Sequence, residues 1–168
     1  MKDSLRTGLT FGLTSGVITT LGLMVGLHSG THSRLVVIGG IVTIAVADAF
    51  SDALGIHISE EAEHVHNTFE IWISTLATFA SKFLFALTFV VPVIFLPLTT
   101  AIIVSLVWGF LILTLLSLHI ARAQGNNPWK VVGEHLLIAG VVIISTHYIG
   151  HFVGRVCSGK DVVSMLGL

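Results

Sequence analysis

Two aspartates, Asp48 and Asp52, are the residues whose types and spacing most directly suggest chemistry. They stand four positions apart inside a long apolar run, so on a helix both carboxylates lie on one face. Carboxylate oxygens suit hard divalent cations, and repulsion between two close anions favours a proton on one of them when no cation is bound. The pair predicts a site that exchanges a metal ion for protons. The alternative is a structural carboxylate that is hydrogen-bonded to a neighbouring helix.

A second group of ionisable residues lies just beyond this run, in the polar segment 59–70. Glu60 and His64 are four apart, and Glu63 and His66 are three apart, which makes each pair neighbours on a helix. Carboxylate together with imidazole suits iron, manganese, zinc or cobalt. We expect this cluster to collect cations at the mouth of a path. The alternative is an ordinary solvated connection.

Other reactive residues carry weaker signals. His147 and His151 are one turn apart and could bind a metal ion together, but we favour the interpretation that they are interfacial or hydrogen-bonded histidines. The single cysteine, Cys157, leaves no internal disulfide and no cysteine metal cluster. Ser15, in Gly12-Leu13-Thr14-Ser15-Gly16, does not form the Gly-x-Ser-x-Gly elbow of hydrolases. An intramembrane hydrolase that uses Ser15 with a histidine stays an alternative, although we expect no enzyme.

The chain that must position these residues has the composition of a membrane protein. Of its 168 residues, 54% are apolar and 10% are charged, whereas a soluble domain carries about 25% charge. The net charge is −1 and no basic patch is present, so we expect no nucleic-acid partner. A carboxylate at membrane depth costs about 2.5–3.5 kcal/mol on insertion scales, and such residues usually mark an ion or proton path.

Five apolar runs are long enough to cross a bilayer, which takes about 20 residues per helix. The runs are continuous, so they predict helices and not barrel strands. We predict an all-α integral membrane protein whose single domain, residues 1–168, is a bundle of five transmembrane helices at about 7–27, 35–58, 71–96, 99–121 and 131–153. Pro92 and Pro97 mark the exit of the third helix. Lys82, inside that helix, is expected to reach the interface by snorkelling.

Lysines and arginines near the ends of the runs indicate the orientation. Four on one side against three on the other favour a cytoplasmic N-terminus: Lys2, Arg6, Arg122 and Lys130 against Arg34, Arg155 and Lys160. The acidic segment 59–70 then faces the cytoplasm.

The first apolar run carries glycines at four-residue spacing in two sets, Gly8, Gly12 and Gly16, then Gly22, Gly26 and Gly30. Small residues at this spacing let helix backbones approach closely in lipid. The two sets are out of phase and must face different neighbours. They serve either packing within the bundle or a subunit interface, and we expect a homodimer packed through Gly8, Gly12, Gly16, Gly22 and Gly26.

The stretch Phe11-Gly12-Leu13-Thr14-Ser15-Gly16-Val17-Ile18-Thr19-Thr20, with the glycine-containing apolar run after it, resembles the first-helix signature of the vacuolar iron transporter family. That signature runs Phe-Gly-x-x-Asp-Gly-x-x-Thr-Thr. Similar features are Ser59-Glu60 at the end of the second helix, the Arg122…Gly125…Pro128 turn and Tyr148-Ile149-Gly150. The resemblance covers the whole chain and is most specific in the first helix.

The resemblance implies five helices with a cytoplasmic N-terminus and a homodimer that exports or sequesters Fe²⁺ or Mn²⁺ in exchange for protons. We expect the protein in the cell membrane of a prokaryote. It implies an ion path between the subunits, lined by the first two helices, where we place Ser15, Thr19, Met24 and Ser59. The metal is the transported substrate, and no permanently bound cofactor is expected.

The chain departs from the family pattern at three points. The first-helix Asp of the family falls on Ser15, and its second-helix Met has no counterpart between Leu35 and Ile71. The Gly-Glu pair of the second helix is matched loosely, with Asp52 as the nearest carboxylate. The long cytoplasmic metal-binding insert of plant and yeast members is reduced to the segment 59–70. A non-transporting membrane scaffold or assembly factor is therefore the main alternative, in which Asp48 and Asp52 can become Asn without effect.

Overall fold

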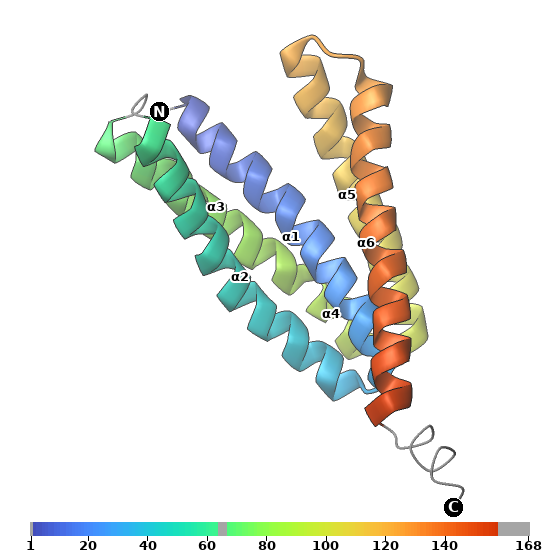
Figure 1. Ribbon diagram of the computed structural model, residues 1–168. Coiled ribbons are helices and arrows are strands. Elements are labelled where there is room, and N and C mark those ends of the chain that lie inside the picture. Colours follow the sequence, from blue (N-terminus) through green and yellow to red (C-terminus); the bar gives the residue numbers. More distant parts are fainter. Residues whose placement is uncertain (1, 64–66, 158–168) are drawn as a thin grey trace, which may run out of the picture. The chain divides into compact units, whose positions relative to one another are not determined.

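The computed structural model describes residues 2–63 and 67–157, and within these ranges every regular element is a helix (Figure 1). The helices are α1 (Lys2–Thr31), α2 (Arg34–Glu63), α3 (Thr68–Thr88), α4 (Val90–Phe95), α5 (Leu98–Gln124) and α6 (Pro128–Cys157). Five stretches are long and apolar enough to cross a membrane: Asp3–Thr31, Arg34–Glu63, Thr68–Phe95, Leu98–Gln124 and Pro128–Cys157. The all-α class is confirmed for the described residues, and they include five helical stretches of membrane-spanning length at the predicted places, each a few residues longer than expected at one or both ends.

Proline separates α3 from α4. Pro92 has no backbone N–H for the carbonyl of Thr88, and its ring would clash with that carbonyl in a continuous helix. Accordingly α3 ends at Thr88 and α4 begins at Val90. Pro97 then precedes the first residue of α5. Pro97 thus follows the end of the third membrane-length stretch as predicted, whereas Pro92 interrupts that stretch about one turn before its own position.

The turn between α5 and α6 is also the predicted one. Gly125 adopts a left-handed conformation with φ of 68°, and its N–H bonds back to the last turn of α5. Such a conformation suits glycine because it has no Cβ. Asn127 then accepts a hydrogen bond from the N–H of Trp129 at 3.1 Å, and Pro128 takes the first helical position.

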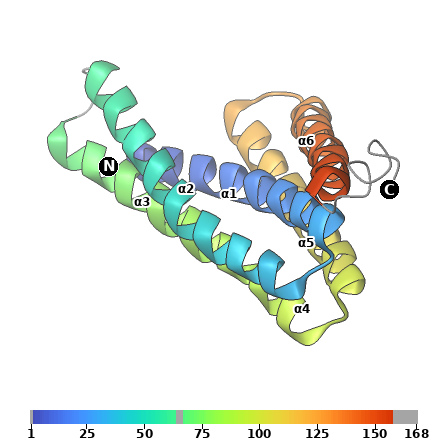
Figure 2. The same ribbon diagram turned by 60° about the horizontal axis from the view of Figure 1, so that its bottom comes forward.

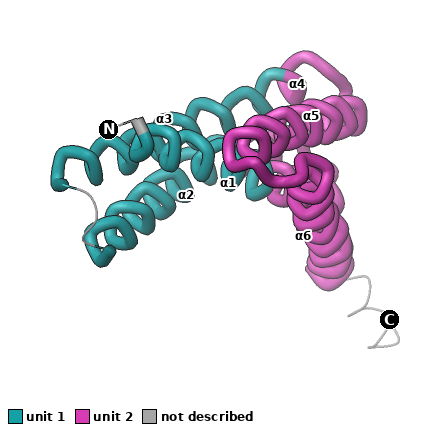
Figure 3. Tube along the Cα trace, turned by 90° about the horizontal axis from the view of Figure 1, so that it is seen from above, with its two compact units in different colours: residues 1–20, 41–91 teal, residues 21–40, 92–168 magenta. Residues whose placement is uncertain are grey.

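The chain divides into two compact units (Figure 3). The first comprises Met1–Thr20 and Ile41–Val91, and the second comprises Leu21–Gly40 and Pro92–Leu168. The boundaries fall inside α1, α2 and α4, so these three helices contribute to both units. In the first unit α1, α2 and α3 run side by side, and in the second α5 packs along α6 (Figures 1 and 2).

Within the first unit, the glycines of α1 lie directly on α3. A Cβ on Gly12 would lie 2.6 Å from the carbonyl oxygen of Thr78, and one on Gly16 would lie 3.2 Å from Cγ of Lys82. A Cβ on Gly8 would meet the backbone at Ser74. These glycines let the two backbones touch.

Within the second unit, the other glycine set of α1 packs on α6. A Cβ on Gly22 would lie 2.7 Å from Cγ1 of Val142, and one on Gly26 would lie 3.3 Å from the carbonyl oxygen of Thr146. The two sets do face different neighbours, as their phase predicted. However, Gly8, Gly12, Gly16, Gly22 and Gly26 all contact helices of the same chain, which favours packing within the chain over the dimer packing expected of them. The homodimer itself stays a prediction.

Candidate ion-binding site

An ion cluster in the first unit joins side chains from three helices: Ser15 of α1, Asp48 and Asp52 of α2, and Lys82 of α3. Nζ of Lys82 lies 2.6 Å from Oδ2 of Asp48 and forms a second ion pair with Oδ2 of Asp52. The Ser15 hydroxyl donates to the same Asp52 oxygen at 2.7 Å and accepts from Lys82 Nζ at 2.8 Å. The two aspartates therefore do share one face of α2, as predicted, and converge on a single ammonium.

The burial of Lys82 contradicts the expectation that it snorkels. Its side chain is 2% exposed, while those of Asp48 and Asp52 are 24% and 20% exposed. Lys82 lies 14 positions beyond Thr68, about 21 Å along the helix at 1.5 Å per residue. A lysine side chain cannot cover that distance, and a buried lysine needs partners. Asp48 and Asp52 supply them, and the absence of a side chain at Gly16 leaves room for the aliphatic stem of Lys82.

The charges of the cluster differ from those predicted. From the sequence we expected two anions together, one of them carrying a proton, whereas the structure puts the Lys82 ammonium between them. Two carboxylates and one hydroxyl oxygen are ligands that hard cations prefer. Among the described residues, including those of this cluster, no group of three or more His, Cys, Asp or Glu side chains is placed to hold a metal. The cluster is thus a cation site whose cation belongs to the protein.

A polar seam along α3 runs from this cluster toward the acidic segment. Its buried members are Ser74, Thr75, Thr78, Ser81 and Lys82. The hydroxyls of Thr75 and Thr78 donate to carbonyls of the preceding turn, Ile71 and Ser74, at 2.7 and 2.8 Å. Their bonding capacity is met largely within the helix, so the seam is a packed polar face of α3.

Glu60 lies at the end of this seam and not in a solvated mouth as predicted. It is 6% exposed, and the Ser74 hydroxyl donates to its Oε2 at 2.6 Å. Helix α2 does continue to Glu63, as expected, and that residue is exposed. His64 and His66 lie outside the described residues. Glu63 is exposed, as expected for the predicted cation-collecting cluster. Glu60 is instead part of the contact between α2 and α3.

His57 is a polar residue of α2 that was not among those predicted from the sequence. Its Nδ1 lies 2.9 Å from the Thr75 hydroxyl, which also lies 2.7 Å from the Ile71 carbonyl. The two side chains therefore share one hydrogen bond between α2 and α3. The ring also meets Trp72 edge-on, with centroids 4.8 Å apart. A histidine between Asp52 and Glu60 in an otherwise apolar helix was the signal that could have identified it.

The predicted path residues have separate environments. Ser15 belongs to the ion cluster, and Thr19 donates to the Ser15 carbonyl at 2.9 Å. Met24 is buried at 1% exposure, and Ser59 is exposed on α2. The structure therefore links Ser15 directly to Asp52, whereas Thr19, Met24 and Ser59 have other surroundings.

In the second unit, His147 is hydrogen-bonded, as favoured from the sequence. Its Nδ1 lies 2.6 Å from the Ser29 hydroxyl, and its ring lies 5.5 Å from that of His151. A similar pair joins α5 to α6, where the Ser117 hydroxyl lies 2.7 Å from Nδ1 of His135. These contacts join helices through imidazole and hydroxyl groups.

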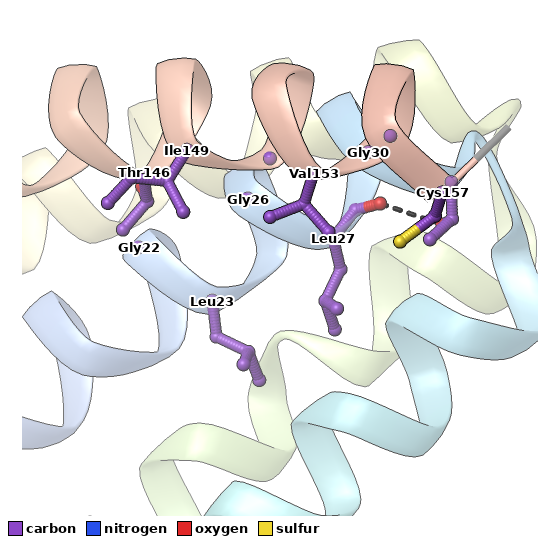
Figure 4. A pocket seen from close by; sticks show the side chains of 12 residues that line it. Gly22, Leu23, Gly26, Leu27, Gly30, Thr146, Ile149, Val153 and Cys157 are labelled. Atoms are coloured by element: carbon purple, nitrogen blue, oxygen red, sulfur yellow. Dashed lines mark hydrogen bonds between the residues drawn. The ribbon is translucent and has the colours of Figure 1, made fainter. Parts of the chain in front are cut away.

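A groove of about 590 Å³ lies between α1 and α6 in the same unit (Figure 4). Gly22, Gly26 and Gly30 form its α1 side, and Thr146, Ile149 and Val153 lie on its α6 side. Thr31, at one end, donates its hydroxyl proton to the Leu27 carbonyl at 2.7 Å. The surface is almost wholly apolar and offers no ligands for a cation.

Within residues 2–63 and 67–157, the fold and the cluster define an all-helical protein with five helical stretches of membrane length and an Asp–Lys–Asp ion cluster around a buried lysine. Comparisons with protein-family models, with curated proteins and with solved structures found no match for this chain.

Proposed function

We propose that the chain is a multi-pass transporter that moves divalent metal ions, Fe²⁺ or Mn²⁺, out of the cytoplasm in exchange for protons. One observation carries this proposal: Asp48, Asp52 and Ser15 converge on the ammonium of Lys82 at the middle of membrane-length helices. Charged groups at that depth are costly and usually belong to an ion path. The resemblance of the first helix to vacuolar iron transporters supports the same substrate class.

The exchange follows from the charges of the cluster. A divalent cation that binds the two carboxylates takes the place of the Lys82 ammonium. Metal binding and proton binding compete for carboxylates, so protons arriving from the acidic side weaken the metal site and favour release. Asp48 and Asp52 are partly exposed, while Lys82 is buried, so a cation approaches from the carboxylate side.

The proposal includes an orientation and an assembly. We place the N-terminus in the cytoplasm, with the exposed Glu61 and Glu63 near the entrance. We expect a homodimer in a prokaryotic cell membrane.

The test is metal uptake by proteoliposomes with a pH gradient, screened over Fe²⁺, Mn²⁺, Co²⁺, Ni²⁺ and Zn²⁺. Asp52 bonds both Ser15 and Lys82, so Asp52→Asn should abolish proton-coupled flux, and Asp48→Asn should reduce it less completely. Glu134→Gln is the matched control. It also removes a carboxylate that is paired with a lysine, but that pair, with Lys130 at 4.0 Å, is exposed on both sides. Wild-type flux with wild-type pH dependence in Asp52→Asn would overturn the proposal.

A second candidate function has one observation in its favour. Ser15 and Lys82 lie 2.8 Å apart, and serine–lysine pairs serve as nucleophile and base in some hydrolases. Here, however, Lys82 donates to Ser15 while two carboxylates hold the ammonium, which has no lone pair to accept a proton. Covalent labelling of wild-type protein but not of Ser15→Ala by a fluorophosphonate probe would support the hydrolase. We expect no labelling of either.

A further inference from the structure

The ammonium of Lys82 has an oxygen partner on each of three residues: it donates hydrogen bonds to Ser15 and Asp52 and forms an ion pair with Asp48. It has three N–H donors, and it contacts three oxygen acceptors, on Asp48, Asp52 and Ser15. The same three oxygens are the ligands that an entering metal would use. A metal ion and the ammonium therefore cannot both occupy the site in this arrangement.

A bound metal would also be repelled by the displaced ammonium. The side chain is attached to α3, and its stem lies against Gly16, where a Cβ would come within 3.2 Å of Cγ. The ammonium can move aside by rotating its flexible stem, but it stays near the site. It thus returns to the carboxylates whenever the metal loosens, because its tether keeps it close to the site.

From this geometry we propose that Lys82 is a tethered competing cation that lowers the affinity of the site and expels the metal. The proposal rests on the proposed function and assigns the release step to this residue. A transport site must bind its ion weakly enough to let it go. Two carboxylates without Lys82 would hold a divalent cation more tightly and release it more slowly.

The main test compares Lys82→Met with wild type by Mn²⁺ binding and by Mn²⁺ flux. Close charge pairs at protein contacts are coupled strongly enough that removing one charge changes affinity about tenfold or more. We expect Mn²⁺ to bind Lys82→Met about tenfold more tightly, with a lower KM and a lower saturated rate of transport. Lys130→Met is the matched control, since Lys130 is 76% exposed, and it should change neither quantity.

Lys82→Arg tests whether the positive charge itself lowers the affinity for the metal. Arginine keeps the positive charge and does not deprotonate in proteins, so it should keep affinity near that of wild type. Mn²⁺ should raise the thermal unfolding temperature of Lys82→Met much more than that of Lys82→Arg or wild type. This measurement needs no transport activity and shows that the variant is folded.

The outcomes separate the two proposals. If wild type carries neither Fe²⁺ nor Mn²⁺, the proposed function fails, while tighter Mn²⁺ binding by Lys82→Met would still support the competing role of Lys82. If wild type transports Mn²⁺ and Lys82→Met binds it no more tightly, the competing role is overturned. A Lys82→Met protein that does not fold even with Mn²⁺ would also overturn it, because the metal should replace the lost charge.

Discussion

Gly12→Ala is expected to destabilise the first unit and not to disrupt a dimer. The added Cβ would lie 2.6 Å from the Thr78 carbonyl oxygen and would overlap the Ser81 hydroxyl. The hydroxyl can rotate, but the carbonyl belongs to the backbone of α3. Helices α1 and α3 must therefore separate locally, and this would disturb the polar contacts between Ser81 and Gly8.

The size of the effect can be bounded. Overpacking of a tight contact costs about 1–3 kcal/mol, and alanine in place of glycine in a helix offsets up to about 1 kcal/mol of that. The net loss for Gly12→Ala is then about 1–2 kcal/mol. Gly55, on α2 in the same unit, has open space within 4 Å of the position that a Cβ would take, so Gly55→Ala should gain about 0.5–1 kcal/mol.

The assay is unfolding in mild detergent by titration with sodium dodecyl sulfate, followed by far-ultraviolet circular dichroism. The two variants should differ by about 2 kcal/mol, a factor of about 30 in the unfolding equilibrium. The loss in Gly12→Ala should be independent of protein concentration, whereas loss of a dimer contact would grow on dilution. Equal effects of both substitutions, or a concentration-dependent loss, would refute the assignment of Gly12 to the α1–α3 contact.

Two further predictions concern charged residues. The triple variant Asp48→Leu, Asp52→Leu, Lys82→Met should be at least as stable as wild type in thermal unfolding and should carry no Mn²⁺, because apolar replacement of a buried ion cluster is often neutral or stabilising by about 1–4 kcal/mol. Glu60→Gln should lower stability by about 1 kcal/mol through its bond to Ser74, whereas Glu63→Gln should leave stability unchanged and raise only the KM for Mn²⁺. A large effect of Glu63→Gln on the saturated rate would instead put it on the path.

Much of the fold followed from the sequence, because a membrane helix needs a continuous apolar run of nearly fixed length. The turn at Gly125 and the break near Pro92 also followed from local backbone chemistry. The pairing of Asp48 and Asp52 on one face depended only on the period of a single helix. These features involve residues close together in the chain.

Contacts between helices were predicted less well, because they depend on which faces meet and at what height. Lys82 lies 30 residues from Asp52 in sequence, and nothing in the local pattern shows that they meet. For the same reason Glu60 was placed in water when it lies against Ser74. The glycine spacing showed that α1 has two close neighbours but could not show whether they belong to the same chain.

The energetics of the cluster bear on whether the chain transports ions or serves as a scaffold. A scaffold needs stable helix contacts, which the glycines of α1 supply at Gly12 and Gly22 without any charge. Burying an ammonium and two carboxylates adds desolvation costs that their attraction offsets only in part. Asp48 and Asp52 keep about a fifth of their side-chain surface exposed, which a purely structural ion pair would not require. A triple variant that is stable but inactive would therefore separate the two functions, because it would keep the packing and lose only the cation site.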